Sequence, residues 1–165
     1  MIVVADSSPL IALINIGHID VLPQLFGQVI IPLEISVELN APNRKQAIRH
    51  FIGTRPDWLL ERAPTRLDPI PALHPGEVAA IRLAQELNAD LLLIDKVRGR
   101  KAAADLSIAF TGTVGVLELA ADRGSLDLQD AFARLKHTDF WISPRLLDER
   151  LKLYERRRRG PASDV

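Results

Sequence analysis

The sequence contains no cysteine among its 165 residues. This absence excludes disulfide bonds and any zinc site that is built on thiolates. It also suits a protein that works in a reducing compartment, so we expect a cytoplasmic location.

The sequence has no excess of charge of either sign, because 21 lysines and arginines balance 21 aspartates and glutamates. Proteins that bind nucleic acids in general usually carry a net positive charge, which this chain lacks. Any site for a polyanion must therefore be a local patch. The four histidines share no metal-ligand spacing, and none is placed to activate a serine nucleophile.

Long apolar runs are also missing. No run approaches the roughly 20 residues that span a bilayer. The apolar segment at the N-terminus has no basic residues before it and is interrupted by Asp6, so we expect neither a signal peptide nor a membrane partner. With 47% hydrophobic residues, the chain can bury a sizeable core as a soluble domain.

Short apolar strands alternate with helical segments along the chain. Strands are expected at residues 2–5, 29–31, 58–60, 91–94 and 107–110, and helices at 9–16, 32–39, 77–87, 100–105, 113–119 and 143–159. This alternation predicts an α/β fold with a central, mostly parallel sheet flanked by helices. We assign residues 1–147 to this domain and 148–165 to a C-terminal helix and a frayed basic tail.

Two acids directly follow the two most hydrophobic strands. Asp6 comes after Val3-Val4-Ala5, and Asp95 comes after Leu92-Leu93-Ile94. Ligands of open parallel sheets bind outside the carboxyl ends of the strands, so these two acids are expected to lie near each other. Glu38, in the helix after the second strand, and Glu77, in the first turn of the central helix, can reach the same edge.

Four carboxylates in an apolar cleft repel one another unless a cation lies between them. Oxygen ligands without cysteine suit Mg²⁺ or Mn²⁺ rather than zinc. Such an ion can polarise a phosphodiester and lower the pKa of an attacking water. The sequence therefore predicts metal-assisted hydrolysis of phosphodiesters.

Five stretches of the sequence form an ordered set of motifs: VADSSPLIALINIG, IIPLEISVELN, HPGEVAAIRLAQELNADLLLIDKVRGRKAA, FTGTVGVLELAADRG and DFWISPRLL. Together they resemble the PIN-domain ribonucleases, and among them the toxins of VapBC-type toxin–antitoxin pairs. The resemblance implies a PIN-like three-layer fold and cleavage of RNA with Mg²⁺ or Mn²⁺. It assigns catalysis to Asp6, Glu38, Glu77 and Asp95, and metal binding to Asp6, Glu77 and Asp95. It also implies a small antitoxin protein as partner, and relatives are often homodimers.

One position departs from this resemblance. Relatives often carry a second acid directly after the position of Asp95, where this chain has Lys96. If the metal uses that position, Lys96 opposes cation binding, which favours a catalytically weak or inactive PIN-like module that binds RNA or a protein. If Asp95 points into the site, Lys96 faces the other way, because side chains of an extended chain alternate.

Basic residues after Asp95 are candidates for contacts with RNA phosphates, and a solvated helix face is an equal alternative. These residues are Lys96, Arg98, Arg100 and Lys101. Ser7 is expected to support Asp6, and Thr113 is expected to cap a helix first and to support the site second.

Each acid also has a simpler interpretation. Asp6 can cap a helix, a role otherwise expected of Ser8, and Glu34 rivals Glu38 from one turn earlier. Trp58, Phe140 and Trp141 are expected to anchor a core or an interface rather than to stack on bases.

Overall fold

Five short strands form one sheet in the computed structural model, which describes residues 1–160. The strands are β1 (Val3–Ala5), β2 (Val29–Pro32), β3 (Leu59–Arg62), β4 (Leu91–Leu93) and β5 (Phe110–Thr111). They lie in the order β3-β2-β1-β4-β5, and each neighbouring pair is parallel. The predicted α/β fold with a parallel sheet is confirmed.

Nine helices connect and cover these strands within residues 1–160. They are α1 (Ser7–Asn15), α2 (Val21–Phe26), α3 (Leu33–Leu39), α4 (Gln46–Gly53), α5 (Pro75–Glu86), α6 (Val97–Asp105), α7 (Thr113–Asp122), α8 (Leu128–Lys136) and α9 (Pro144–Arg159). The sequence pattern does not predict α2, α4 or α8. These three helices have six to nine residues each.

The sheet is covered by helices on both faces, as a three-layer fold requires. Val3 and Ala5 of β1 pack into one core cluster with residues of α1, α2 and α7, whereas Val4 packs into a second cluster with residues of α5 and α6. Successive strand side chains point to opposite faces, so a strand covered on both sides is apolar without interruption. This explains why β1 and β4 are recognisable in the sequence.

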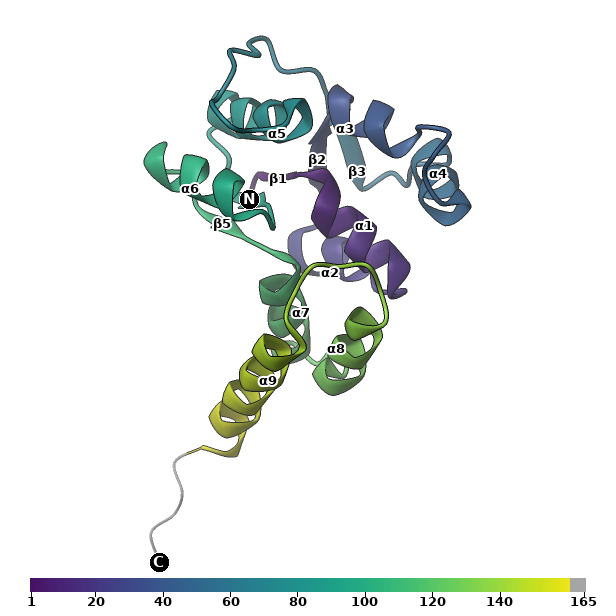
Figure 1. Cartoon of the computed structure of the whole chain (residues 1–165), viewed down its shortest axis with the longest axis vertical. Coiled ribbons are helices and arrows are strands. Elements are labelled where there is room, and N and C mark those ends of the chain that lie inside the picture. Colours follow the sequence, from purple (N-terminus) through teal and green to yellow (C-terminus); the bar gives the residue numbers. More distant parts are fainter. Residues whose placement is uncertain (161–165) are drawn as a thin grey trace, which may run out of the picture.

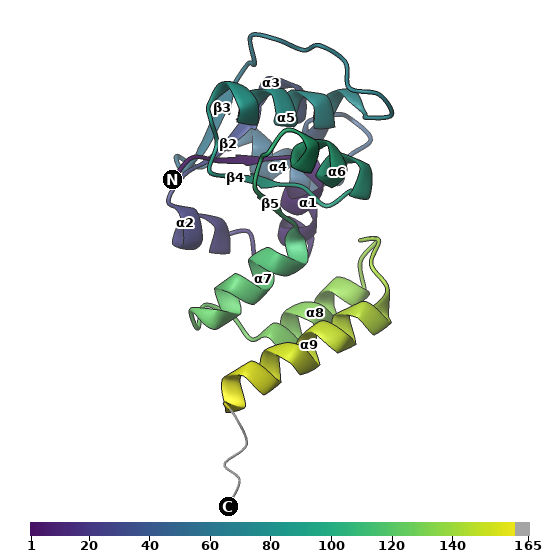
Figure 2. The same cartoon turned by 90° about the vertical axis from the view of Figure 1, so that its left-hand side faces the viewer.

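Helices α7, α8 and α9 lie at the end of the molecule away from α3 and α5 (Figures 1 and 2). The carboxylate of Glu118 in α7 is buried and accepts from Arg150 of α9, with an Nε–Oε1 distance of 2.6 Å. Helix α9 also buries Leu147 and Tyr154, and it runs through the predicted boundary between residues 147 and 148. Residues 161–165 of the predicted frayed tail lie outside the described residues.

Most predicted elements differ from the structure by one to three residues at an end, and two of these differences matter for the site. The residue that precedes α1 is Asp6 rather than Ser8, because the helix begins at Ser7. Strand β5 begins at Phe110 rather than Ser107, because Ser107 has a φ of 58° and closes the end of α6 by donating to the carbonyl of Ala104. In the described part of the chain, no helix is long and apolar enough to cross a membrane.

Candidate functional site

The strand order reverses at β1, which lies between β2 and β4. From β1 the chain builds the sheet outward to β2 and β3 on one side, and later to β4 and β5 on the other. Ligands of such sheets bind where the order reverses. Asp6 lies at this point, and its backbone N–H donates to the carbonyl of Leu93 over 2.9 Å.

Three acids gather at this edge, and we call Asp6, Glu38 and Glu77 the acid cluster. Glu77 lies in the first turn of α5, and Glu38 lies in the last turn of α3. Gly76 shows how closely the two helices approach, because a Cβ on Gly76 would lie 2.8 Å from Oε2 of Glu38. A side chain at position 76 would require the Glu38 carboxylate to shift.

Asp6 is the most deeply buried member of the cluster, with 2% of its surface exposed. Burial is the main cause that raises the pKa of Asp6 from 3.8 to about 7, and the negative charges of Glu77 and Glu38 raise it further. A backbone hydrogen bond from Ser7 and the charge of Lys96 act in the opposite direction. Among the described residues, Oδ1 of Asp6 has no hydrogen-bond partner.

Two cations pair with the other two acids. The ammonium of Lys96 lies 2.8 Å from Oε1 of Glu77, and the guanidinium of Arg44 lies 2.8 Å from Oε1 of Glu38. The hydrogen bond with Glu77 is the main cause that raises the pKa of Lys96, and the charges of Glu77, Asp6 and Glu38 contribute. Lys96 therefore interacts with every member of the acid cluster.

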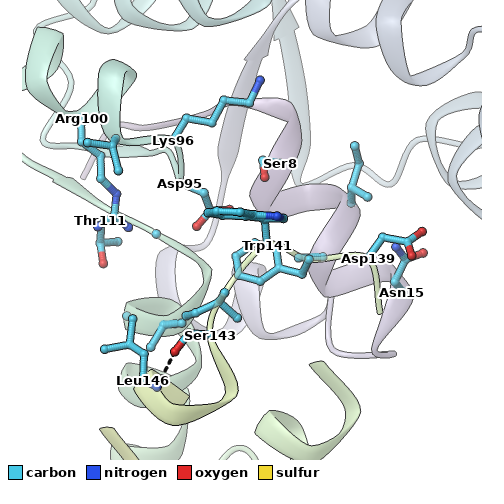
Figure 3. A pocket seen from close by; sticks show the side chains of 18 of the residues that line it. Ser8, Asn15, Asp95, Lys96, Arg100, Thr111, Asp139, Trp141, Ser143 and Leu146 are labelled. Carbon is cyan, nitrogen blue, oxygen red and sulfur yellow. Dashed lines mark hydrogen bonds between the residues drawn. The ribbon is translucent and has the colours of Figure 1, made fainter. Parts of the chain in front are cut away.

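Asp95 does not join this cluster. Its Oδ1 accepts from the backbone N–H of Thr113 over 2.7 Å, and its Oδ2 accepts from the Thr113 hydroxyl over 2.8 Å. Gly112 permits this approach, because a Cβ there would lie 2.5 Å from Oδ1. Figure 3 shows that Asp95 and Lys96 leave the strand end in different directions. Asp95 is thus oriented to the start of α7, and Lys96 faces the acids.

The capping role predicted for Thr113 belongs to Asp95. Thr113 is the first residue of α7 and donates both of its hydrogen bonds, whereas the carboxylate of Asp95 accepts them. A carboxylate at a helix N-terminus satisfies an unpaired N–H and complements the helix dipole. Thr113 holds Asp95 in place through these two hydrogen bonds.

A groove of about 1010 Å³ lies beside the acid cluster. Its lining includes five basic and two acidic side chains: Arg44, Lys45, Lys96, Arg100, Arg150, Asp95 and Asp139. Lys96 and Arg44 border both the groove and the acids, so they lie between the two. Trp141 also lines the groove and is 98% exposed (Figure 3).

The predicted basic residues divide into two pairs. Lys96 and Arg100 line the groove, and Arg100 also donates to the carbonyl of Ile94 and covers the ring of Phe110. Arg98 and Lys101 are exposed on α6, apart from the described lining residues. Their assignment to phosphate contacts gains no support from this geometry.

Sequence reasoning missed Arg44, and of the core and interface environments expected for Trp141 the structure excludes the core. Arg44 lies in the turn between α3 and α4, which brings it back to Glu38 six residues earlier. No spacing rule signals such a return. Trp141 is not a core residue, because the loop between α8 and α9 exposes its ring, and a sequence does not show which aromatic residue of a loop faces solvent.

The acid cluster matches the donor chemistry of Mg²⁺ or Mn²⁺. It offers carboxylate oxygens only, and the buried Oδ1 of Asp6 is available to a ligand because no described group bonds to it. Nevertheless, no three acids or histidines within residues 1–160 already converge as a metal site. The ion pairs of Glu77 with Lys96 and of Glu38 with Arg44 occupy oxygens that an ion would need.

Comparison with known proteins identifies the family. A family model described as a PIN domain matches residues 2–156. No curated protein and no solved structure matches the chain. PIN domains are generally nucleases and generally use divalent metal ions.

Proposed function

This chain belongs to the PIN-domain family, and we propose that it is a metal-dependent endoribonuclease, the toxin of a VapBC-type toxin–antitoxin pair. The observation that carries the proposal is the acid cluster at the point where the strand order reverses. The three carboxylates come from separate parts of the chain, and two of them raise the pKa of the third. Such mutual repulsion is typical of a site that binds a cation.

Asp6, Glu38 and Glu77 are the residues that would hold Mg²⁺ or Mn²⁺. When bound, such an ion would polarise the phosphodiester and lower the pKa of the attacking water. The chain itself supplies the surroundings. Asp95 fixes the start of α7, Gly76 admits Glu38 to the edge of α5, and Ser7 supports Asp6 through its backbone.

The groove is the proposed binding site for single-stranded RNA. Its lining contains more basic than acidic side chains, which supports a site for a polyanion, although Arg44, Lys96 and Arg150 already pair with Glu38, Glu77 and Glu118. Lys45 and Arg100 are suited to phosphates, and Trp141 offers an aromatic face to a base. The reacting phosphodiester would lie near Lys96, which borders both the groove and the acid cluster.

The proposed antitoxin would cover the same groove. Apolar side chains contribute to the lining beside the basic ones, and Val97 and Trp141 are 81% and 98% exposed. A small protein with apolar and acidic side chains would bury these residues and pair with the cations. This arrangement would close the route from solvent to the acids.

The proposal is tested by incubating the purified full-length protein with a labelled single-stranded RNA. Internal cleavage is expected with Mn²⁺ or Mg²⁺, and none with EDTA, because without the ion nothing lowers the pKa of the attacking water. Gel analysis of the products gives the rate and the cleavage positions. Equal cleavage in EDTA would contradict the metal dependence.

Replacing Trp141 by alanine is expected to weaken RNA binding by about 5- to 100-fold, which corresponds to the loss of one stacked base. Fluorescence anisotropy with RNA in EDTA measures this affinity without cleavage. Trp141→Phe, which retains a ring, is expected to bind within about threefold of the wild type. Leu153→Ala is a suitable control, because Leu153 is a half-exposed apolar residue on α9. Unchanged affinity in Trp141→Ala would remove Trp141 from the proposed RNA site.

The second candidate function is a catalytically weak or inactive module that binds RNA or a protein. The ion pair between Lys96 and Glu77 favours it, because Lys96 already provides a positive charge within the acid cluster. RNA binding without cleavage at every Mn²⁺ concentration would support this candidate. Metal-dependent cleavage that requires the acid cluster would exclude it.

A further inference from the structure

The backbone places Lys96 beside the acid cluster. Lys96 directly precedes α6, and the first turn of this helix packs closely on the end of β4. Gly99 permits the contact, because a Cβ there would lie 2.5 Å from Cδ1 of Ile94. The same Cβ would lie 4.0 Å from Oε2 of Glu77, so α6 begins next to the Glu77 carboxylate. Lys96 is therefore anchored within reach of Glu77.

Arg44 and Lys96, the two cations beside the acid cluster, differ in the number of carboxylates with which they interact. Among the described residues, Arg44 forms an ion pair only with Glu38. Lys96 forms its ion pair with Glu77 and also interacts favourably with the charges of Asp6 and Glu38. Lys96 is therefore the cation that interacts with all three carboxylates, which is the relationship that a bound metal ion would have.

Lys96 also lies on the route into the cluster. Its side chain lines the groove and is 61% exposed, whereas the side chain of Glu77 is 6% exposed. An ion that enters from the groove towards Glu77 therefore meets the ammonium first. The ammonium and a divalent ion compete for Oε1 of Glu77, and they repel each other at such short range.

We infer that Lys96 is a tethered competitor of the divalent ion, so that metal binds to the acid cluster only when the ammonium leaves Glu77. The inference rests on the proposed function for the kind of ion that competes. Lysine is suited to this exchange, because its charge is compact and its four-carbon stem is flexible. The displaced ammonium moves into the groove, where phosphates are proposed to bind.

Mn²⁺ titration of the metal-free, full-length protein tests the inference without RNA. Calorimetry compares the wild type with Lys96→Met, which keeps the length of the side chain and removes its charge. Lys96→Met is expected to bind Mn²⁺ at least about tenfold more tightly, because a neighbouring positive charge is lost. Lys152→Met is the matched control, because Lys152 is an exposed lysine on α9, and its Mn²⁺ affinity is expected to equal that of the wild type.

Thermal unfolding gives a second readout. In EDTA, Lys96→Met is expected to unfold at a lower temperature than the wild type, because the carboxylates lose their shared cation. Mn²⁺ is expected to raise the unfolding temperature of Lys96→Met more than that of the wild type. Lys96→Gln, which can still donate a hydrogen bond to Glu77, provides the same comparison if Lys96→Met fails to fold without metal.

Three outcomes overturn the inference. One is an unchanged Mn²⁺ affinity in both Lys96→Met and Lys96→Gln. Another is a gain in affinity that persists in the double variant Lys96→Met/Glu77→Gln, which would place the ion elsewhere. The third is an equal gain in Lys152→Met. The measurements of Mn²⁺ affinity and unfolding contain no RNA. If the wild type failed to cleave RNA in the separate cleavage assay, the proposed nuclease activity would be contradicted, but the competition between Lys96 and the metal ion would not.

Discussion

Replacing Asp6 by asparagine is expected to lower the rate of metal-dependent RNA cleavage by roughly 10²- to 10³-fold. Asp6 is the deepest member of the acid cluster, and its Oδ1 is bonded to no described group. The substitution keeps the shape of the side chain and removes the charge that would hold a cation. The initial rate of cleavage of one defined RNA in Mn²⁺ measures the loss.

Asp105→Asn is the matched control for this prediction, because Asp105 is an exposed aspartate at the end of α6. It is expected to cleave at the wild-type rate. The affinity of Asp6→Asn for RNA in EDTA is expected to stay within about threefold of the wild type, because Asp6 is buried and does not line the described groove. Cleavage by Asp6→Asn at the wild-type rate would remove Asp6 from the catalytic assignment.

The free energy of unfolding of the metal-free protein is expected to fall as the pH rises from about 4 to about 7. The pKa of Asp6 is about 7 in the folded state, whereas its ordinary value is 3.8. Between these two values the folded state binds a proton that the unfolded state has released, so each increase in pH disfavours folding. The difference between the two pKa values corresponds to at most about 4 kcal/mol.

Asp6→Asn is expected to remove this pH dependence and to be more stable than the wild type above pH 7. Urea unfolding at pH 5 and pH 8 in EDTA measures both effects. Asp105→Asn is expected to retain the wild-type dependence, because Asp105 is exposed to solvent. The assigned role of Asp6 would be contradicted if the free energy of unfolding of the wild type rose from pH 5 to pH 8 and that of Asp6→Asn rose by the same amount.

The two predictions for Asp6 follow from one physical condition. A carboxylate that is buried beside two others destabilises the metal-free fold when it is charged. The same arrangement favours a cation, whose binding would offset the repulsion. We therefore expect Asp6→Asn to gain stability and to lose activity, whereas a residue with a purely structural role would lose both.

The sequence alone predicts the strands that hold the site. Strands β1 and β4 are apolar without interruption because both of their faces are buried, and this pattern needs no knowledge of their neighbours. The position of Asp6 follows from the rule that ligands bind at the carboxyl ends of parallel strands. Glu77 is predictable as well, because Pro75 and Gly76 mark the start of α5 and place an acid in its first turn.

Only the tertiary structure decides which of two adjacent residues faces the acids. The sequence allows either Asp95 or Lys96 to point into the site. Neighbouring side chains of an extended chain point in opposite directions, but the sequence does not show which of the two faces the acids. The direction of Asp95 depends on β5 and on α7, because Thr113 at the start of α7 donates two hydrogen bonds to Asp95. Asp95 turns towards them, and Lys96 consequently turns towards Glu77.

The ion pair of Arg44 with Glu38 and the exposure of Trp141 likewise depend on the tertiary structure. Both residues lie in segments that connect two helices, where the direction of a side chain depends on the helices on either side rather than on a repeating pattern. The sequence thus determined the strands and the position of Asp6 at the end of one of them, because burial of apolar strands is a local signal. The balance of charge around Asp6 depends on contacts between distant segments, so only the folded chain decided it.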